Sequence, residues 1–215
     1  VESPDSTVAE QLQQLAIVDS VKWIWKGNLR VPAEEKWEDR FVSEDEPLHN
    51  EYGYSYKQIK MLNGTKLHEA GFRGEGMRVA VIDAGFMNAD RVSAFDSLRL
   101  LGTHNVVFPG KSVFVGDDHG TKVLSCLAAD IPGVMVGTAP KASYLLLKSE
   151  DSDSEYPVEE DYWTAAVEYA DSAGVDVISS SLGYFAFDTD ELSYDQDALD
   201  GRTAMISRAA NLAAD

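Results

Sequence analysis

Two segments of the chain carry residues that could act together in acid–base chemistry. An apolar run over residues 79–82 ends on Asp83, and His119 lies between an aspartate and a glycine at the expected start of a helix. A histidine acts as a general base when a carboxylate fixes its tautomer and orientation. Asp83 is the candidate carboxylate; Asp117 and Asp118 compete, although side chains adjacent in sequence rarely reach the far ring nitrogen. The segments supply two members of an Asp/His/Ser apparatus, and the serine is missing.

Both residues also have plain structural interpretations. Asp is a common cap and turn residue, so position alone favours a structural role for Asp83. A His-Gly pair in a loop is often only a turn. His119, however, opens an apolar helix in a chain with four histidines. His49, His68 and His104 have no comparable setting, and we interpret all three as surface residues.

A third segment, Ser181-Leu182-Gly183, leaves an expected buried strand. Such a stretch can offer free backbone N–H and C=O groups to an extended peptide. An ordinary strand terminus is an equally good interpretation, since Ser and Gly are common turn residues.

The composition excludes several classes of protein. The 215 residues carry 37 acidic and 18 basic side chains, a formal net charge of −19. This balance argues against a nucleic-acid partner or an anionic membrane surface. No apolar run approaches the roughly 20 residues that a membrane span needs. The charge serves solubility, although acidic loops could also hold Ca²⁺. The single cysteine, Cys126, excludes an internal disulfide and a cysteine-based zinc cluster.

The elements that position these residues alternate between strand and helix, which predicts right-handed crossovers and a mostly parallel sheet. In such sheets functional groups gather at the carboxyl ends of the strands. We expect strands over 77–83, 142–148 and 175–180, and helices over 55–70, 121–129, 157–173 and 202–215.

Two helix starts are predicted from capping boxes, Thr7 with Glu10 and Ser55 with Gln58. The second helix should place its apolar residues on one face, and Gly64 weakens this prediction. The residues expected on that face are Ile59, Leu62 and Leu67.

The N-terminal part has a different pattern. A strand-like stretch covers residues 21–25, and residues 32–50 are charged and polar, as in an exposed linker. We therefore divide the chain into residues 1–31, a linker or processing region over 32–50, and a main domain over 51–215.

Four motifs in order closely resemble the subtilisin-like serine proteases, or subtilases. Residues 79–85 (VAVIDAG) resemble the segment around the catalytic aspartate of the family, and residues 118–123 (DHGTKV) that around its histidine. Residues 136–140 (VGTAP) and the strand after them resemble the next core segment. Residues 175–183 (VDVISSSLG) resemble the strand whose Ser-Leu-Gly lines the substrate subsites. The resemblance covers roughly 52–215, and residues 1–31 are more loosely similar to the end of an inhibitory propeptide.

The resemblance implies a truncated, three-layer α/β fold with a mostly parallel sheet and helices on both faces, plus a small α+β propeptide remnant. It implies a serine-type endopeptidase in which Asp83 and His119 are catalytic and Ser181, Leu182 and Gly183 bind the substrate. No cofactor is required, and Ca²⁺ is expected only as a structural ion. The implied location is extracellular or in the cell envelope.

The sequence departs from the family pattern in places. Ala84 stands where Ser or Thr is usual, which removes a local hydroxyl hydrogen bond. Lys122 replaces a second histidine, and Ser179 an asparagine. No Gly-Thr-Ser nucleophile motif is present, because every Gly-Thr pair is followed by another residue type. We therefore expect this chain alone to be inactive and to self-associate unless a complementary C-terminal fragment of the same protein binds.

The sequence leaves two other interpretations open. One is a non-catalytic, subtilase-derived module that binds peptides. The other is a nucleotide-binding domain, because residues 71–76 (GFRGEG) are rich in glycine. Phosphate-binding glycines should follow a strand and open a helix, whereas these precede a strand.

Overall fold

The computed structural model describes residues 7–15, 18, 21 and 50–214. Within the first range, α1 (Thr7–Gln13) is the expected helix, but it begins at Thr7, so this residue lies inside the first turn and does not precede it. Of the strand expected over 21–25 only Val21 is described, and of the linker expected over 32–50 only Asn50; the rest of both segments lies outside the described residues.

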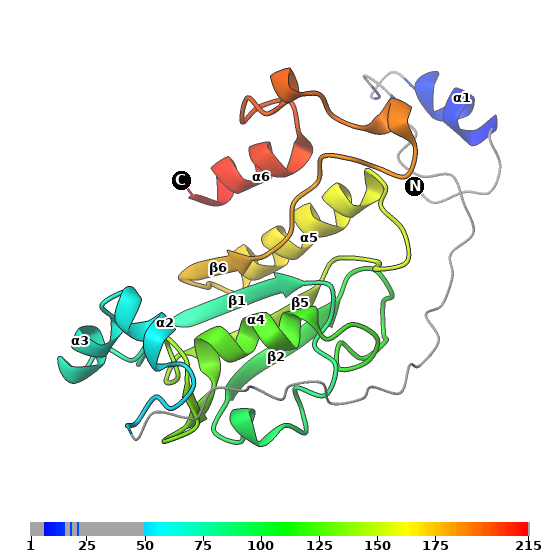
Figure 1. Cartoon of the computed structure of the whole chain (residues 1–215). Helices are drawn as coiled ribbons and strands as arrows, with labels where there is room; N and C mark the ends of the chain where they lie inside the picture. Colours follow the sequence, from blue (N-terminus) through cyan, green and yellow to red (C-terminus); the bar gives the residue numbers. More distant parts are fainter. Residues whose placement is uncertain (1–6, 16–17, 19–20, 22–49, 215) are drawn as a thin grey trace.

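A four-stranded parallel sheet forms the centre of the main body (Figure 1). Its strand order is β2-β5-β1-β6. The strands are β1 (Arg78–Asp83), β2 (Arg99–Asn105), β5 (Ser143–Lys148) and β6 (Val177–Ser180). Three of them match expected strands; β2 was not predicted. The glycine-rich residues 71–76 lead into β1, so they do not open a helix after a strand and lack the context of a phosphate loop.

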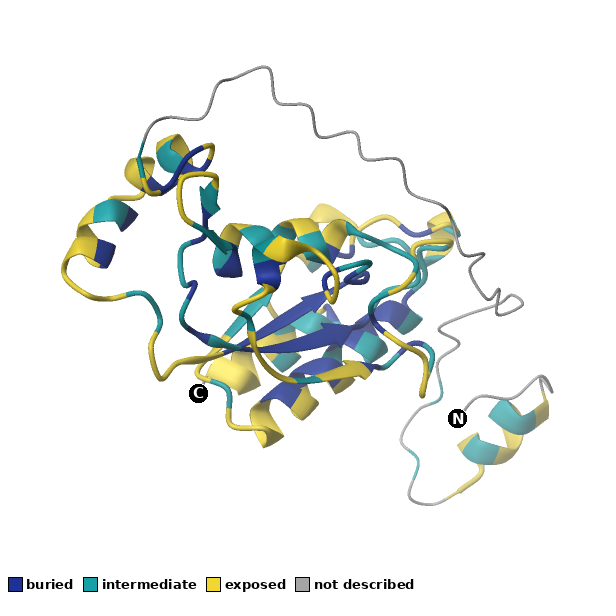
Figure 2. Cartoon of the chain, turned by 90° about the horizontal axis from the view of Figure 1, so that it is seen from below, coloured by how far each residue is buried: buried dark blue, intermediate teal, exposed yellow. Residues whose placement is uncertain are grey.

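The two faces of β1 and β5 contribute to different parts of the core, because successive strand residues point to opposite sides. On one face, odd-numbered β1 residues and even-numbered β5 residues pack with α4 (His119–Ala128). On the other, the alternate residues pack with α5 (Val158–Ser172), against which α6 (Met205–Ala214) lies. Figure 2 shows the buried residues concentrated in the strands and on the inner sides of these helices. The predicted α/β architecture, a mostly parallel sheet between helices, is confirmed.

The helix expected over 55–70 is two short helices, α2 (Tyr56–Met61) and α3 (Gly64–Glu69). Between them Asn63 adopts a left-handed conformation with φ of 57°, which no continuous helix allows. Ser55 makes no capping bond; its hydroxyl oxygen instead accepts from the N–H of Val136 and lies 2.8 Å from the carbonyls of Tyr52 and Val136, to one of which it can donate its single hydrogen. The prediction that Ile59, Leu62 and Leu67 share one buried apolar face is also wrong, since Ile59 is buried whereas Leu62 and Leu67 are exposed.

The remaining elements are short. A small antiparallel pair joins β3 (Asp130–Ile131) and β4 (Met135–Val136). Three 3₁₀ turns cover Ser93–Phe95, Asp190–Leu192 and Gln196–Ala198. Among the described residues, no helix combines the length and the apolar character that crossing a membrane requires.

His68 is buried, which overturns its interpretation as a surface residue. Its Nε2 lies 2.9 Å from the carbonyl of Thr138, which can only accept, so Nε2 carries the hydrogen. In the neutral ring, Nδ1 then accepts from the Tyr52 hydroxyl at 3.1 Å. His104 is exposed, as predicted, and stacks on Tyr169 with ring centroids 4.7 Å apart.

We expect His68→Ala to destabilise the fold by about 2 kcal/mol, because it leaves the buried Tyr52 hydroxyl and the Thr138 carbonyl unpaired. Chemical denaturation monitored by circular dichroism measures this loss. The control is His104→Ala, which removes only a surface ring contact and should cost about 0.5 kcal/mol. Equal losses in the two variants would contradict the buried hydrogen-bonded role of His68.

Candidate active site

Asp83 and His119 meet at the carboxyl end of the sheet. Asp83 is the last residue of β1, and His119 is the first of α4. The Nδ1 of His119 lies 2.7 Å from Oδ1 of Asp83. Asp83 is fully buried, whereas the His119 side chain is 49% exposed. With the aspartate ionised, Nδ1 donates, so the neutral ring keeps its lone pair on Nε2, the arrangement that a general base needs.

The alternative aspartates are engaged elsewhere. Asp117 accepts from the backbone N–H of His119 at 2.7 Å and from the Ser152 hydroxyl at 2.9 Å. Asp118 pairs with Lys122, whose Nζ lies 2.8 Å away. Among the residues the structure describes, Asp83 is therefore the carboxylate on the imidazole ring.

A close approach of α4 to the end of β1 makes this pairing geometrically feasible. A Cβ atom on Gly120 would lie 2.4 Å from the carbonyl oxygen of Gly85 and 2.8 Å from Cβ of Asp83. Contacts this short do not occur, so only glycine lets the first turn of α4 lie against β1. The hydroxyl of Thr121 adds a hydrogen bond of 2.8 Å to the carbonyl of Met87.

The two partners influence each other's protonation. The hydrogen bond to Asp83 is the largest influence on the pKa of His119 and raises it; burial opposes this rise, and the charges of Asp83, Asp117 and Glu150 add to it. Burial raises the pKa of Asp83, and the hydrogen bonds from His119 and from the N–H of Ala84 oppose this rise. The second carboxylate oxygen, Oδ2, is buried and has no partner in the described part of the chain. Its lack of a donor agrees with the presence of Ala84, which has no hydroxyl, at a position where Ser or Thr is usual.

Lys148 is a residue of this site that the sequence analysis did not single out. It is the last residue of β5, lies opposite Asp83 in the strand register and is buried. Its Nζ donates to the carbonyl of Ala84, which fixes the turn after Asp83. Burial lowers the pKa of Lys148. The sequence feature that could have pointed to Lys148 is its position as the one charged residue at the end of an otherwise apolar strand.

The segment Ser181-Leu182-Gly183 follows β6, the strand at one edge of the sheet. The last paired residues of β1 and β6 are Ile82 and Ser180, so Ser181 follows β6 at the level of Asp83, the last residue of β1. Ser181 and Gly183 are exposed, and Leu182 packs against the core on the α5 side. An exposed edge of this kind can pair with an extended peptide.

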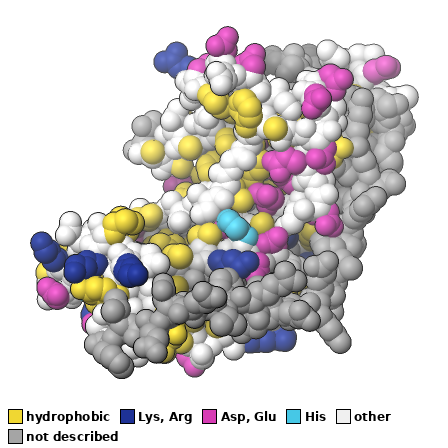
Figure 3. Space-filling view, viewed as in Figure 1, with side chains coloured by type: hydrophobic (Ala, Val, Ile, Leu, Met, Phe, Trp, Pro, Cys, Tyr) yellow, Lys and Arg dark blue, Asp and Glu magenta, His cyan; other side chains and the backbone are white. Residues whose placement is uncertain are grey.

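An acidic hollow lies in the loop that joins β5 to α5. It is lined by Glu150 through Glu155 and by Asp188. Figure 3 shows acidic side chains gathered on the face on which a histidine is also exposed. Burial and the charges of Asp83 and Asp117 raise the pKa of Glu150, so this loop lies within electrostatic reach of the Asp83–His119 pair.

Comparisons with known proteins point to one group. The chain is 32% identical to subtilisin E of Bacillus subtilis (strain 168) over 147 residues, which cover 66% of this chain and 36% of that protein. It is 31% identical to the major intracellular serine protease of the same strain over 133 residues, or 58% of this chain and 40% of that protein. The chain thus spans little more than a third of the length of these relatives.

Solved structures agree in fold. The serine protease MycP1, described as an essential component of the type VII (ESX-1) secretion system, matches with a TM-score of 0.52 and 21% identity, over 86% of this chain and 48% of that one. MycP1 without its N-terminal propeptide matches with a TM-score of 0.50 and 21% identity, over 74% and 44%. No protein-family model matches the chain. By sequence the chain is therefore similar to the subtilisins, and by fold it is a subtilisin-like α/β protein.

Proposed function

We propose that this chain is the N-terminal part of a subtilisin-like serine endopeptidase, or subtilase. The observation that carries the proposal is the 2.7 Å hydrogen bond between His119 and the buried Asp83 at the carboxyl end of the parallel sheet. The sequence similarity to subtilisin E and to other serine proteases supports the same activity.

In the proposed mechanism, a serine hydroxyl attacks the carbonyl of the scissile peptide bond. The Nε2 of His119 accepts the serine proton and passes it to the leaving amine. Asp83 holds the ring in the required tautomer and stabilises the imidazolium that forms. The half-exposed ring and the fully buried carboxylate suit these two tasks, since only the ring must reach the reactants.

The proposed substrate is a peptide or protein segment that lies extended along Ser181, Leu182 and Gly183. Backbone groups of this exposed segment would pair with it as an added strand. Ser181 and Asp83 lie at the same height along neighbouring strands, at the carboxyl end of the sheet. This arrangement supports the placement, because it puts the bound backbone near His119.

The proposed nucleophile lies outside the 215 residues. The Gly-Thr pairs are followed by Lys66, His104, Lys122 and Ala139, and none is followed by serine. Without a nucleophile and an oxyanion-binding group, the base and its partner have no reaction to assist. We propose that the missing groups come from a complementary C-terminal segment.

Two further proposals concern the whole protein. Residues 1–31 are the end of an inhibitory propeptide, and the protein acts outside the cell or in the cell envelope.

A serine-directed fluorophosphonate tests this assignment. We expect no labelling of the 215-residue chain and labelling of the longer parent protein at one serine. His119→Ala in the parent should abolish the labelling, whereas His104→Ala should not. Stoichiometric labelling of the 215-residue chain would overturn the proposed location of the nucleophile. An unlabelled parent that lacks a Gly-Thr-Ser motif would favour the peptide-binding module instead.

A further inference from the structure

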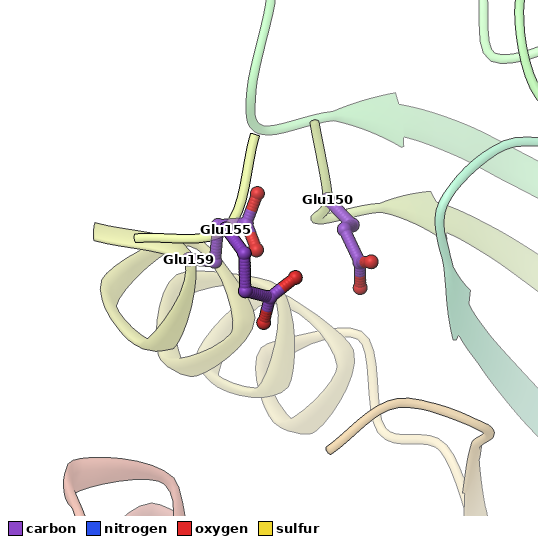
Figure 4. Close-up of side chains that lie close together, drawn as sticks. All are labelled: Glu150, Glu155 and Glu159. Carbon is purple, nitrogen blue, oxygen red and sulfur yellow. The ribbon is translucent and has the colours of Figure 1, made fainter. Parts of the chain in front are cut away.

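Three glutamates converge beside the sheet, apart from the Asp83–His119 pair. Glu150 follows β5, Glu155 lies in the loop before α5, and Glu159 is in the first turn of α5. One carboxylate oxygen from each lies within 4.8 Å of one from each of the others (Figure 4). Carboxylates that close repel one another unless a proton or a cation lies between them.

A second observation concerns Glu159 itself. Only 1% of this residue is exposed. Its Oε1 accepts from the backbone N–H of Asp151 at 3.2 Å, but its buried Oε2 has no partner among the described residues. A buried carboxylate is normally paired or bound to a metal, because leaving its oxygen unsatisfied costs a substantial desolvation free energy.

Lys148, the basic side chain beside this cluster, does not neutralise the negative charge of the three glutamates. Lys148 directs its Nζ to the carbonyl of Ala84, on the side of Asp83. The charge of Asp188 adds to the repulsion that Glu155 experiences. The site thus has an excess of negative charge and a buried oxygen that lacks a donor.

We propose that Glu150, Glu155 and Glu159 bind a divalent cation, and that this cation is Ca²⁺. The donor set consists of oxygens alone, which favours Ca²⁺ or Mg²⁺ over metals that prefer nitrogen or sulfur. Ca²⁺ accepts oxygens at about 2.3–2.6 Å in irregular arrangements, so two ligands on opposite sides lie about 4.6–5.2 Å apart. All three oxygens lie within 4.8 Å of one another, so one cation can contact them, and Ca²⁺ tolerates an irregular set of carboxylates better than Mg²⁺, which requires near-ideal octahedral geometry.

The bound ion would join the loop after β5 to the start of α5. Glu150 comes from one side of this junction and Glu159 from the other, and residues 151–155 between them line the acidic hollow. Ca²⁺ would therefore hold this loop in place and remove the repulsion between its carboxylates. This inference does not depend on the proposed protease activity.

Calcium binding to the whole 215-residue chain tests the proposal. After removal of metals with EDTA, isothermal titration calorimetry with CaCl₂ should give one site per chain, and MgCl₂ should bind at least ten-fold more weakly. Ca²⁺ should also raise the melting temperature. Tb³⁺ supplies a local signal, because Tyr184, which experiences the charges of all three glutamates, should sensitise its luminescence.

Two variants locate the site. Glu159→Gln keeps the shape of the side chain and should weaken Ca²⁺ binding at least ten-fold. Glu168→Gln removes the same charge from an exposed position of the same helix and should leave the affinity unchanged. Circular dichroism shows whether each variant is folded, and Glu150→Gln, at a less buried position, replaces Glu159→Gln if the latter unfolds. Absence of a one-to-one site, or equal binding by the Glu159 and Glu168 variants, would overturn the proposal.

Discussion

Asp83→Asn should lower the pKa of His119 and, in the complete enzyme, reduce kcat by about 10⁴-fold. The asparagine retains the shape of the side chain but removes the charge that stabilises the imidazolium. It also offers the ring an amide in place of a carboxylate oxygen, so the tautomer with hydrogen on Nδ1 loses its preference. The first effect is measured on the 215-residue chain by an NMR titration of the His119 ring. The second is measured on the parent protein with a peptide substrate.

The matched control for this prediction is Asp118→Asn. Asp118 directly precedes His119 in the chain but pairs with Lys122 and does not contact the imidazole. Its replacement removes the same charge from a residue that is closer to His119 in the sequence than Asp83 is. It should nevertheless change the pKa of His119 and kcat little. If the two variants behave alike, the hydrogen bond between Asp83 and His119 does not set the properties of the ring.

Gly120→Ala should destabilise the fold by about 3 kcal/mol, because the new methyl group meets backbone atoms that cannot yield. For a chain of this size, that corresponds to a fall in melting temperature of roughly 6–12 °C. The added carbon would lie 2.4 Å from the Gly85 carbonyl oxygen and 2.9 Å from Cε1 of Phe86. Relief of these contacts pushes α4 away from β1 and lengthens the distance from His119 to Asp83.

Gly102→Ala is the comparison for this substitution. A Cβ atom on Gly102 would meet only the flexible side chain of Leu145, at an ordinary 3.6 Å. Its melting temperature should therefore stay within about 2 °C of the parent chain, since a substitution that makes only an ordinary contact with a flexible side chain costs less than about 0.5 kcal/mol. Differential scanning calorimetry of both variants measures the contrast, and a Gly120 variant as stable as the Gly102 variant would refute the close-packing account.

The buried strands and the long helices could be predicted because their sequence patterns are strong. β1 and β5 are near-continuous apolar runs, as strands covered on both faces should be. β2 lacks such a run. It lies at the edge of the sheet, most of its residues are exposed, and its register shifts between Leu100 and Gly102. An exposed, irregular edge strand carries little periodic signal.

The break between α2 and α3 depends on one backbone conformation. Residues 55–70 have helical spacing, but Asn63 takes the left-handed conformation that asparagine tolerates better than most residues. His68 failed as a prediction for a different reason. Its partner Thr138 lies 70 residues away, so its burial follows from tertiary structure and not from the local pattern.

The Asp83–His119 pair could be predicted because its geometry follows from topology. A carboxylate at the end of a parallel strand and a histidine at the start of a packed helix reach the same sheet edge. The three glutamates had no such signal. Glu159 and Glu160 are typical of the first turn of a helix, where acidic residues complement the helix dipole, and nothing local indicates that Glu159 is buried.

The strand order has a consequence for synthesis on the ribosome. β1 lies between β5 and β6, yet β5 begins at Ser143, roughly 60 residues after β1 ends at Asp83. At translation rates of about 5–20 residues per second, the apolar β1 waits roughly 3–12 seconds before its first partner has been made. During that interval both of its edges are open to other chains. Slowing translation after residue 83 should therefore increase aggregation of nascent chains, whereas chaperones that shield extended apolar segments should reduce it.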